Sequence, residues 1–98
     1  MDIKQAFAKA LRDTRKIRQL TQEDFSVVSS RTYLSTLERG LKSPTLDKIQ
    51  SLSKVLEIHP LTLLVLAFGH VEDAGHAEVL EKVAKEIDQI TGSSGRKK

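Results

Sequence analysis

Residues 29–40, with the sequence SSRTYLSTLERG, place many hydrogen-bond donors at helical spacing. At 100° per residue, Leu34 and Leu37 point to one side of such a helix. The opposite side carries five donors and no carboxylate: Arg31, Thr32, Ser35, Thr36 and Arg39. Arginine can donate two hydrogen bonds to the edge of guanine, and hydroxyls can bond to bases or phosphates. This face would suit a nucleic acid, but an ordinary amphipathic helix has the same pattern, so both interpretations stay open.

The elements that would position this stretch are all predicted to be helical. Apolar residues recur at spacings of three and four, and no segment alternates with a period of two. The predicted helices cover residues 2–18, 22–28, 31–39, 46–56 and 60–68. Short polar side chains are expected to cap the first four of them: Asp2, Thr21, Ser30 and Thr45. Gly40 and Gly69 are expected to end the third and fifth helices, and Pro60 suits a first helical position.

The predicted helices share one small apolar core, because each has an inward stripe. The first stripe is expected to contain Ile3, Phe7, Ala10, Leu11 and Thr14. The fourth helix is expected to bury Leu46, Ile49, Leu52, Ser53 and Leu56. Ninety-eight residues are enough for one domain with a core of this size.

The C-terminal segment has a different character. In HAEVLEKVAKEIDQI, residues 76–90, four apolar residues follow the a/d spacing of a coiled-coil seam: Leu80, Val83, Ile87 and Ile90. This seam could pack back on LTLLVLAF, residues 61–68, or pair with its copy in a second chain, and the homodimer is favoured. We therefore predict a helical unit at 1–69, whose donor-rich helix could bind a nucleic acid, a dimerisation helix at 70–91 and a disordered basic tail at 92–98.

Charge is distributed unevenly along the chain. Residues 1–45 hold nine Lys/Arg and five Asp/Glu, whereas residues 46–91 hold four Lys/Arg and eight Asp/Glu. A basic half joined to an acidic half suggests that one half meets an anionic partner. The chain has no cysteine, no apolar run of about 20 residues and no signal core, so we expect a cytoplasmic protein without a membrane span.

Three segments in order, TQEDF, SSRTYLSTLERG and SPTLDKIQSLSKVLEIHPLTLL, resemble the lambda-repressor-like helix-turn-helix family of the Cro/XRE type. The resemblance covers about residues 7–66. It implies an all-α, five-helix domain, here with an additional C-terminal helix, whose third helix enters the major groove of double-stranded DNA. Between Gln22 and Glu38 the chain is about two residues shorter than the family pattern, and Glu57 stands where glycine often closes the fourth helix.

The resemblance also implies roles for individual residues. Arg31, Thr32 and Thr36 match the principal base-reading positions, and Ser35 is placed with them in an auxiliary role. The positions implied to contact phosphate lie around them: Gln22, Ser30, Arg39, Lys42 and Ser43. In the family, the glutamate at Glu38 pairs with an arginine of the first helix, which here is Arg15. Such a pair would lock the reading helix to its scaffold.

Other classes of function find little support in the residues. His59, His70 and His76 match no zinc-binding spacing, and no nucleophile–base pair stands out, so we expect neither a metal, nor a cofactor, nor an enzyme. The favoured function is sequence-specific, nucleoid-associated DNA binding by a bacterial or phage transcriptional regulator. The alternative is an antitoxin that also regulates its own operon, with the acidic half binding a basic toxin. A helix-turn-helix used only as a protein interaction module is the third hypothesis.

Overall fold

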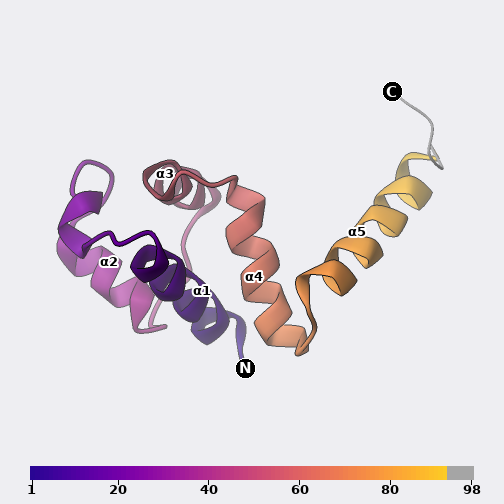
Figure 1. Ribbon diagram of the computed structural model, residues 1–98, viewed down its shortest axis with the longest axis horizontal. Coiled ribbons are helices and arrows are strands. Elements are labelled where there is room, and N and C mark those ends of the chain that lie inside the picture. Colours follow the sequence, from indigo (N-terminus) through magenta and orange to yellow (C-terminus); the bar gives the residue numbers. More distant parts are fainter. Residues whose placement is uncertain (93–98) are drawn as a thin grey trace.

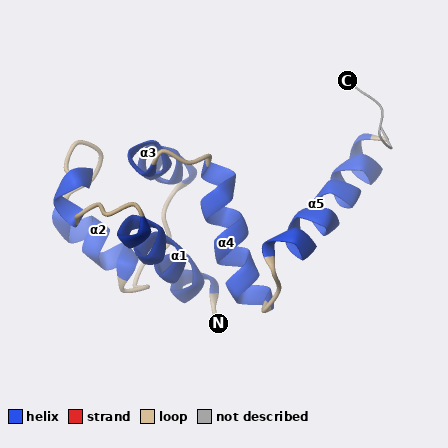
Figure 2. Cartoon of the chain, viewed as in Figure 1, coloured by secondary structure: helices blue, strands red, loops and turns tan. Residues whose placement is uncertain are grey.

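The computed structural model describes residues 1–92, which form five α-helices, one short 3-10 helix and no strand (Figure 2). The elements are α1 (Ile3–Ile17), η1 (Gln22–Phe25), α2 (Arg31–Glu38), α3 (Leu46–Leu56), α4 (Pro60–Glu72) and α5 (His76–Thr91). The predicted all-helical fold is confirmed. Apart from Gly92, the predicted basic tail lies outside the described residues.

The helix starts follow the capping signals in the sequence. Three predicted caps each accept a hydrogen bond from the amide three residues later: Asp2 from Gln5, Ser30 from Tyr33, and Thr45 from Lys48. Such a bond satisfies one of the free N–H groups at a helix N-terminus. Before η1 the acid of the Thr-x-x-acid pattern makes the capping bond: the Asp24 carboxylate accepts from the N–H of Thr21, three residues earlier, at 2.8 Å.

Two predicted helices have wrong limits. The second, expected over 22–28, is only the 3-10 turn Gln22–Phe25, because the shortened segment must turn at once to reach Ser30. The fifth was expected to end before Gly69, yet α4 continues to Glu72 and Asp73 closes it at φ +54°. Gly69 stays helical and makes room for the returning chain, since a Cβ there would lie 2.9 Å from the carbonyl oxygen of Ala74.

The predicted boundary between residues 69 and 70 therefore falls within α4. The division of the chain into functional parts at that boundary stays a prediction. Among the described residues no single helix is long and apolar enough to span a membrane. Taken together, α3 and α4 have the length and composition of a span, but they are bent by 106° at their connection.

The core lies where α1, α2, α3 and α4 meet, with α1 packed along α4 (Figure 1). Its fully buried large side chains come from every one of these elements and from η1: Leu11, Phe25, Leu34, Leu37, Leu52, Leu56 and Leu63. Burying one such side chain contributes about 1.5–3 kcal/mol. Two residues predicted to be buried are not, since Ile3 and Leu46 open their helices and are 41% and 78% exposed.

The last helix stands apart from this core. From the turn at residues 73–75, α4 and α5 diverge like the arms of a V, and α5 projects away from α1 and α2 (Figure 1). α5 packs against α4 and buries Val79. The candidate reading helix and the C-terminal helix thus lie at opposite ends of the molecule (Figure 1).

Candidate nucleic-acid interface

The outer face of α2 is open to solvent and the inner face is packed. Leu34 and Leu37 are fully buried, which fixes the rotation of the helix about its axis. Arg31, Thr32 and Arg39 are exposed. Ser35 and Thr36, on the same outer face, are half-buried. The five predicted donors therefore form one continuous polar surface.

A two-point ion pair joins α2 to α1. Arg15 Nε donates to Glu38 Oε2 at 2.7 Å, and Arg15 Nη2 donates to Glu38 Oε1 at 2.9 Å. The side chains are only 13% and 5% exposed, so the pair is largely removed from water. The hydrogen bond that Arg15 donates to Glu38 raises the pKa of Arg15, burial lowers it in part, and the charge of Glu38 raises it further. The structure thus brings together the two residues that the resemblance implies to be partners.

Three further groups complete the network around Glu38. Arg12 Nη1 donates to the backbone oxygen of Glu38 at 2.8 Å, and Arg15 Nη1 donates to the carbonyl of Leu20 at 3.0 Å. Gln22 Nε2 donates to Glu38 Oε1 at 3.1 Å. A side-on guanidinium–carboxylate pair with additional donors leaves few lone pairs of the buried carboxylate unsatisfied. The end of α2 is thereby held by α1 and by η1.

In this network Gln22 makes a contact that differs from the expected one. The residue was expected to offer its amide to phosphate, but in the structure the amide donates to Glu38 and ties η1 to α2. Its phosphate contact stays a prediction, and the hydrogen bond that it makes in the structure joins η1 to the C-terminal end of α2.

Local hydrogen bonds determine which donors and acceptors near the outer face of α2 remain available to a ligand. The Thr36 hydroxyl donates to the carbonyl of Thr32 at 2.8 Å, so its oxygen and methyl group remain available outward. Ser30 Oγ accepts from the N–H of Tyr33, which leaves its hydrogen free to donate. Arg31 Nη1 lies 3.9 Å from Glu23 Oε1, too far for a hydrogen bond, and both side chains are exposed.

Candidate phosphate contacts flank the outer face at both ends of α2. Ser30 precedes the helix, Arg39 ends it, and Lys42 and Ser43 follow in the loop before α3; all four are exposed. Gly40 begins that loop at φ +74°, a left-handed conformation that glycine adopts without strain.

The shortened turn before α2 is held by a residue that the sequence did not single out. Lys48 Nζ donates to the carbonyl of Val28 at 2.6 Å and lies 5.3 Å from the centre of the Tyr33 ring. It therefore bridges α3, the turn and α2, and adds a cation–π contact. The available signal was that Lys48 stands one helical turn before buried Leu52, on the side of α3 that faces the core.

The part of the chain that the structure describes contains no group of three or more His, Asp or Glu side chains placed to hold a metal ion. Of the three histidines, His59 has a defined structural role: its Nδ1 accepts from the N–H of Leu61 and caps α4.

The comparisons with known proteins decide the family. A family model described as helix-turn-helix, of the Cro/C1 type, matches residues 11–63, more than half of the chain. The chain belongs to this helix-turn-helix family. The match contains η1, α2, the shortened turn and both partners of the Arg15–Glu38 pair. As a member of this family, the helix-turn-helix protein is a DNA-binding regulator and not an enzyme.

A solved structure supports the fold along nearly the whole chain. The clp gene regulator ClgR from Corynebacterium glutamicum is similar at 24% identity with a TM-score of 0.69. The similarity covers 91% of this chain and 94% of that one, so it extends beyond the family match to the C-terminal helix. No curated protein matches the chain.

Proposed function

We propose that the helix-turn-helix protein binds double-stranded DNA sequence-specifically as a homodimer, with α2 in the major groove, and regulates transcription in this way. The observation that carries the proposal is the outer face of α2, which presents five polar side chains and no carboxylate and is held from behind by the pair of Glu38 with Arg15. A preorganised helix with such a face suits the major groove, where base edges are distinguishable.

The two kinds of contact separate along this surface. Arg31, Thr32 and Thr36, with Ser35, would meet base edges, and the Thr36 methyl would suit thymine. Gln22, Ser30, Arg39, Lys42 and Ser43 would set the register by contacting phosphates. Phosphate contacts position a protein on the duplex, whereas base contacts specify the sequence.

The length of the reading helix argues for two copies. An α2 of 8 residues can bring only a few side chains to the base edges. A symmetric dimer doubles these contacts by reading two half-sites about 10 bp apart. The exposed α5 seam of Leu80, Val83, Ile87 and Ile90 gives such a dimer an apolar interface.

The test is to select bound sequences from a random DNA pool and then measure Arg31→Ala on the best of them. We expect a loss of about 1–3 kcal/mol on the selected site and relaxed preference at one base position. Lys85→Ala removes a positive charge from α5, far from α2, and serves as the control. Affinity for the selected site should fall steeply with salt for all variants, as counterions are released.

Two results would contradict this proposal. If Arg31→Ala weakens selected and random DNA to the same small extent as Lys85→Ala, Arg31 does not read a base. If the wild type selects no sequence and its binding does not depend on salt, the outer face of α2 is not a DNA surface.

A second candidate function, the antitoxin, has one observation in its favour. α5 carries an acidic excess and a long uncovered apolar side, which could cover a basic protein. The antitoxin would form a stable complex with a small basic protein encoded beside it. Copurification of that pair, with loss of the complex in an α5 variant, would establish this function in addition to DNA binding.

A further inference from the structure

The apolar side of α5 is wider than a coiled-coil seam requires. On a helical wheel the residues from Val79 round to Ala77 span an arc of about 160° without a charged side chain. The arc includes the four seam residues and Ala84, and also His76 and Thr91 at the two ends of the helix. A two-stranded coiled coil uses only a narrow a/d stripe, whereas a wider arc is typical of a helix that packs against several others. Of this arc, only Val79 at one edge is buried.

The neighbouring helix has an uncovered apolar side as well. α4 buries Leu63 and Ala67 against the core, and its opposite side presents Leu61, Val65 and Phe68. Leu61 is 59% exposed, and Phe68 is also exposed. A helix that is apolar on both sides is normally covered on both sides. The outer side of α4 therefore needs a partner in the same way as α5.

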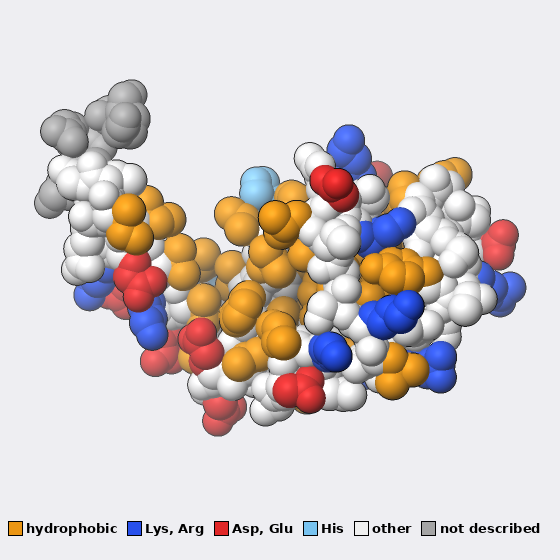
Figure 3. Space-filling model, turned by 180° about the vertical axis from the view of Figure 1, so that it is seen from behind, with side chains coloured by type: hydrophobic (Ala, Val, Ile, Leu, Met, Phe, Trp, Pro, Cys, Tyr) orange, Lys and Arg blue, Asp and Glu red, His pale blue; other side chains and the backbone are white. Residues whose placement is uncertain are grey.

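These two uncovered sides face one groove, the α4–α5 groove. Its walls are Leu61, Leu64, Val65 and Phe68 of α4 with Val79, Leu80 and Val83 of α5, and it has a volume of about 370 Å³. Glu72 is the one charged residue that lines it. Apolar side chains gather over α4 and along the facing side of α5 (Figure 3).

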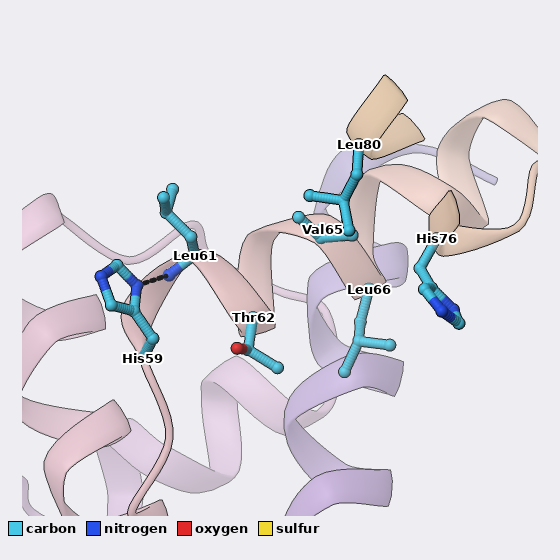
Figure 4. Close-up of a pocket in the computed structure, with 7 residues that line it drawn as sticks. All are labelled: His59, Leu61, Thr62, Val65, Leu66, His76 and Leu80. Atoms are coloured by element: carbon cyan, nitrogen blue, oxygen red, sulfur yellow. Dashed lines mark hydrogen bonds between the residues drawn. The ribbon is translucent and has the colours of Figure 1, made fainter. Parts of the chain in front are cut away.

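A second hollow of about 480 Å³ adjoins the groove and shares Leu61, Val65 and Leu80 with it. In the close-up, Val65 of α4 and Leu80 of α5 point toward one another, while His59 caps the start of α4 through Leu61 (Figure 4). Together the two hollows extend from the α4–α5 connection to the first turn of α4, and most of the residues that line them are apolar.

The far end of α5 carries apolar side chains that could fill this apolar groove. Ile87 and Ile90 are 52% and 84% exposed and lie on the same arc as Leu80, beyond the reach of the groove walls. Each chain therefore carries an apolar groove and, on the far half of α5, an apolar ridge without a charge in its arc. In a two-fold symmetric dimer, the ridge of each copy can occupy the groove of the other, and no further copy can then be added.

We propose that the α4–α5 groove is the seat for the far half of α5 from a second copy of this chain. Ile87 and Ile90 of each copy would pack on Leu61, Val65 and Phe68 of the other, so that α4 and α5 of both copies form a four-helix arrangement. The inference rests on the homodimer proposed above and deepens it, because it assigns α4 as half of the interface.

The test compares self-association of single and double variants by sedimentation at about 20 μM. Leu61→Glu and Ile87→Arg each place a charge in the proposed interface, and each should weaken dimerisation by on the order of 100-fold. The double variant places Glu at 61 opposite Arg at 87 of the other copy, and it should recover the dimer. Both changed positions are exposed, and circular dichroism should show unchanged helix content in all three variants.

Leu46→Glu is the matched control, since Leu46 is another exposed leucine in the first turn of a helix. It should remain as dimeric as the wild type, which would show that a new charge alone does not dissociate the chains. Dissociation by Leu46→Glu would overturn the assignment of the interface.

The remaining outcomes separate the two proposals. A monomeric wild type would overturn the homodimer itself, and would leave the groove for a different protein. A dimer that Ile87→Arg dissociates and Leu61→Glu does not would keep the homodimer but overturn the seat on α4, because α5 would then pair with its copy alone. Two dissociating single variants without recovery in the double variant would overturn the proposed pairing of residues 61 and 87.

Discussion

Replacing Glu38 with Gln removes one charge from the network that holds α2 and changes almost nothing in shape. Arg15 would keep its hydrogen bond to the carbonyl of Leu20, and the new amide oxygen could accept one of the two bonds that Glu38 accepts now. The second donor of Arg15 would then face the amide NH₂ group. The guanidinium, with a side chain only 13% exposed, would be left without a counter-charge.

The expected cost follows from these contacts. Breaking a fully buried pair by removing one partner costs about 3–5 kcal/mol, because it leaves an uncompensated charge. Here the retained hydrogen bonds and the partial exposure of Arg15 reduce the cost to about 2–3 kcal/mol. For a domain of this size each kcal/mol shifts Tm by about 4–8 °C, so the shift should be about 10–20 °C.

The assays are thermal and urea unfolding followed by circular dichroism, at one fixed protein concentration because a dimer unfolds in a concentration-dependent way. The matched control is Glu23→Gln, which makes the same change at a side chain that is 72% exposed and 3.9 Å from Arg31. The control should change stability by less than about 0.5 kcal/mol.

A Glu38→Gln variant that melts within about a degree of the wild type would refute the argument, since the ion pair would then contribute nothing net. Equal effects of Glu38→Gln and Glu23→Gln would refute it as well. A further check is the pair change Arg15→Met with Glu38→Leu, which removes both charges and should be less destabilising than Glu38→Gln alone.

Three other perturbations test separate parts of the structure. Glu57→Gly should stabilise the fold by about 0.5–1 kcal/mol in thermal unfolding, since Glu57 is exposed at φ +60° where a side chain costs energy. Gly40→Ala should cost about 1–2 kcal/mol, because φ is +74° and the added Cβ would lie 2.6 Å from Gln5 Nε2. Lys48→Met removes the donor to the Val28 carbonyl and should lower affinity for the selected DNA more than for random DNA; equal losses on both would show that the turn does not orient α2.

Most helix limits were predictable because they are set by neighbours in the sequence. Asp2, Ser30 and Thr45 cap their helices as expected, since an N-cap needs only a side chain and an amide three residues later. The buried positions Leu34 and Leu37 followed from helical periodicity. Arg15 and Glu38 lie 23 residues apart, and a resemblance to a known family, not local pattern, suggested that they meet.

The wrong predictions have a tertiary cause. Gly69 was expected to end its helix, but it lies inside α4. Glycine suits this position because the carbonyl oxygen of Ala74 leaves no room for a side chain. The bond from Lys48 to Val28 joins residues 20 positions apart, which local rules cannot anticipate. The a/d seam on α5 stays a prediction, but the groove that α5 shares with α4 could not be predicted, because it depends on the angle between the two helices.

The attachment of α2 has a consequence for how such a protein can change over evolution. The contacts that hold α2 in place lie away from its outer face: Arg15 of α1 bonds to Glu38, and Lys48 of α3 bonds to the turn before α2. The outer side chains of α2 are therefore expected to contribute little to the stability of the fold. Substitutions at Arg31 and Thr32 should therefore be nearly neutral for stability, as exposed positions usually are. The preferred DNA site could then drift from one sequence to another in single steps, with every intermediate protein still folded and able to dock.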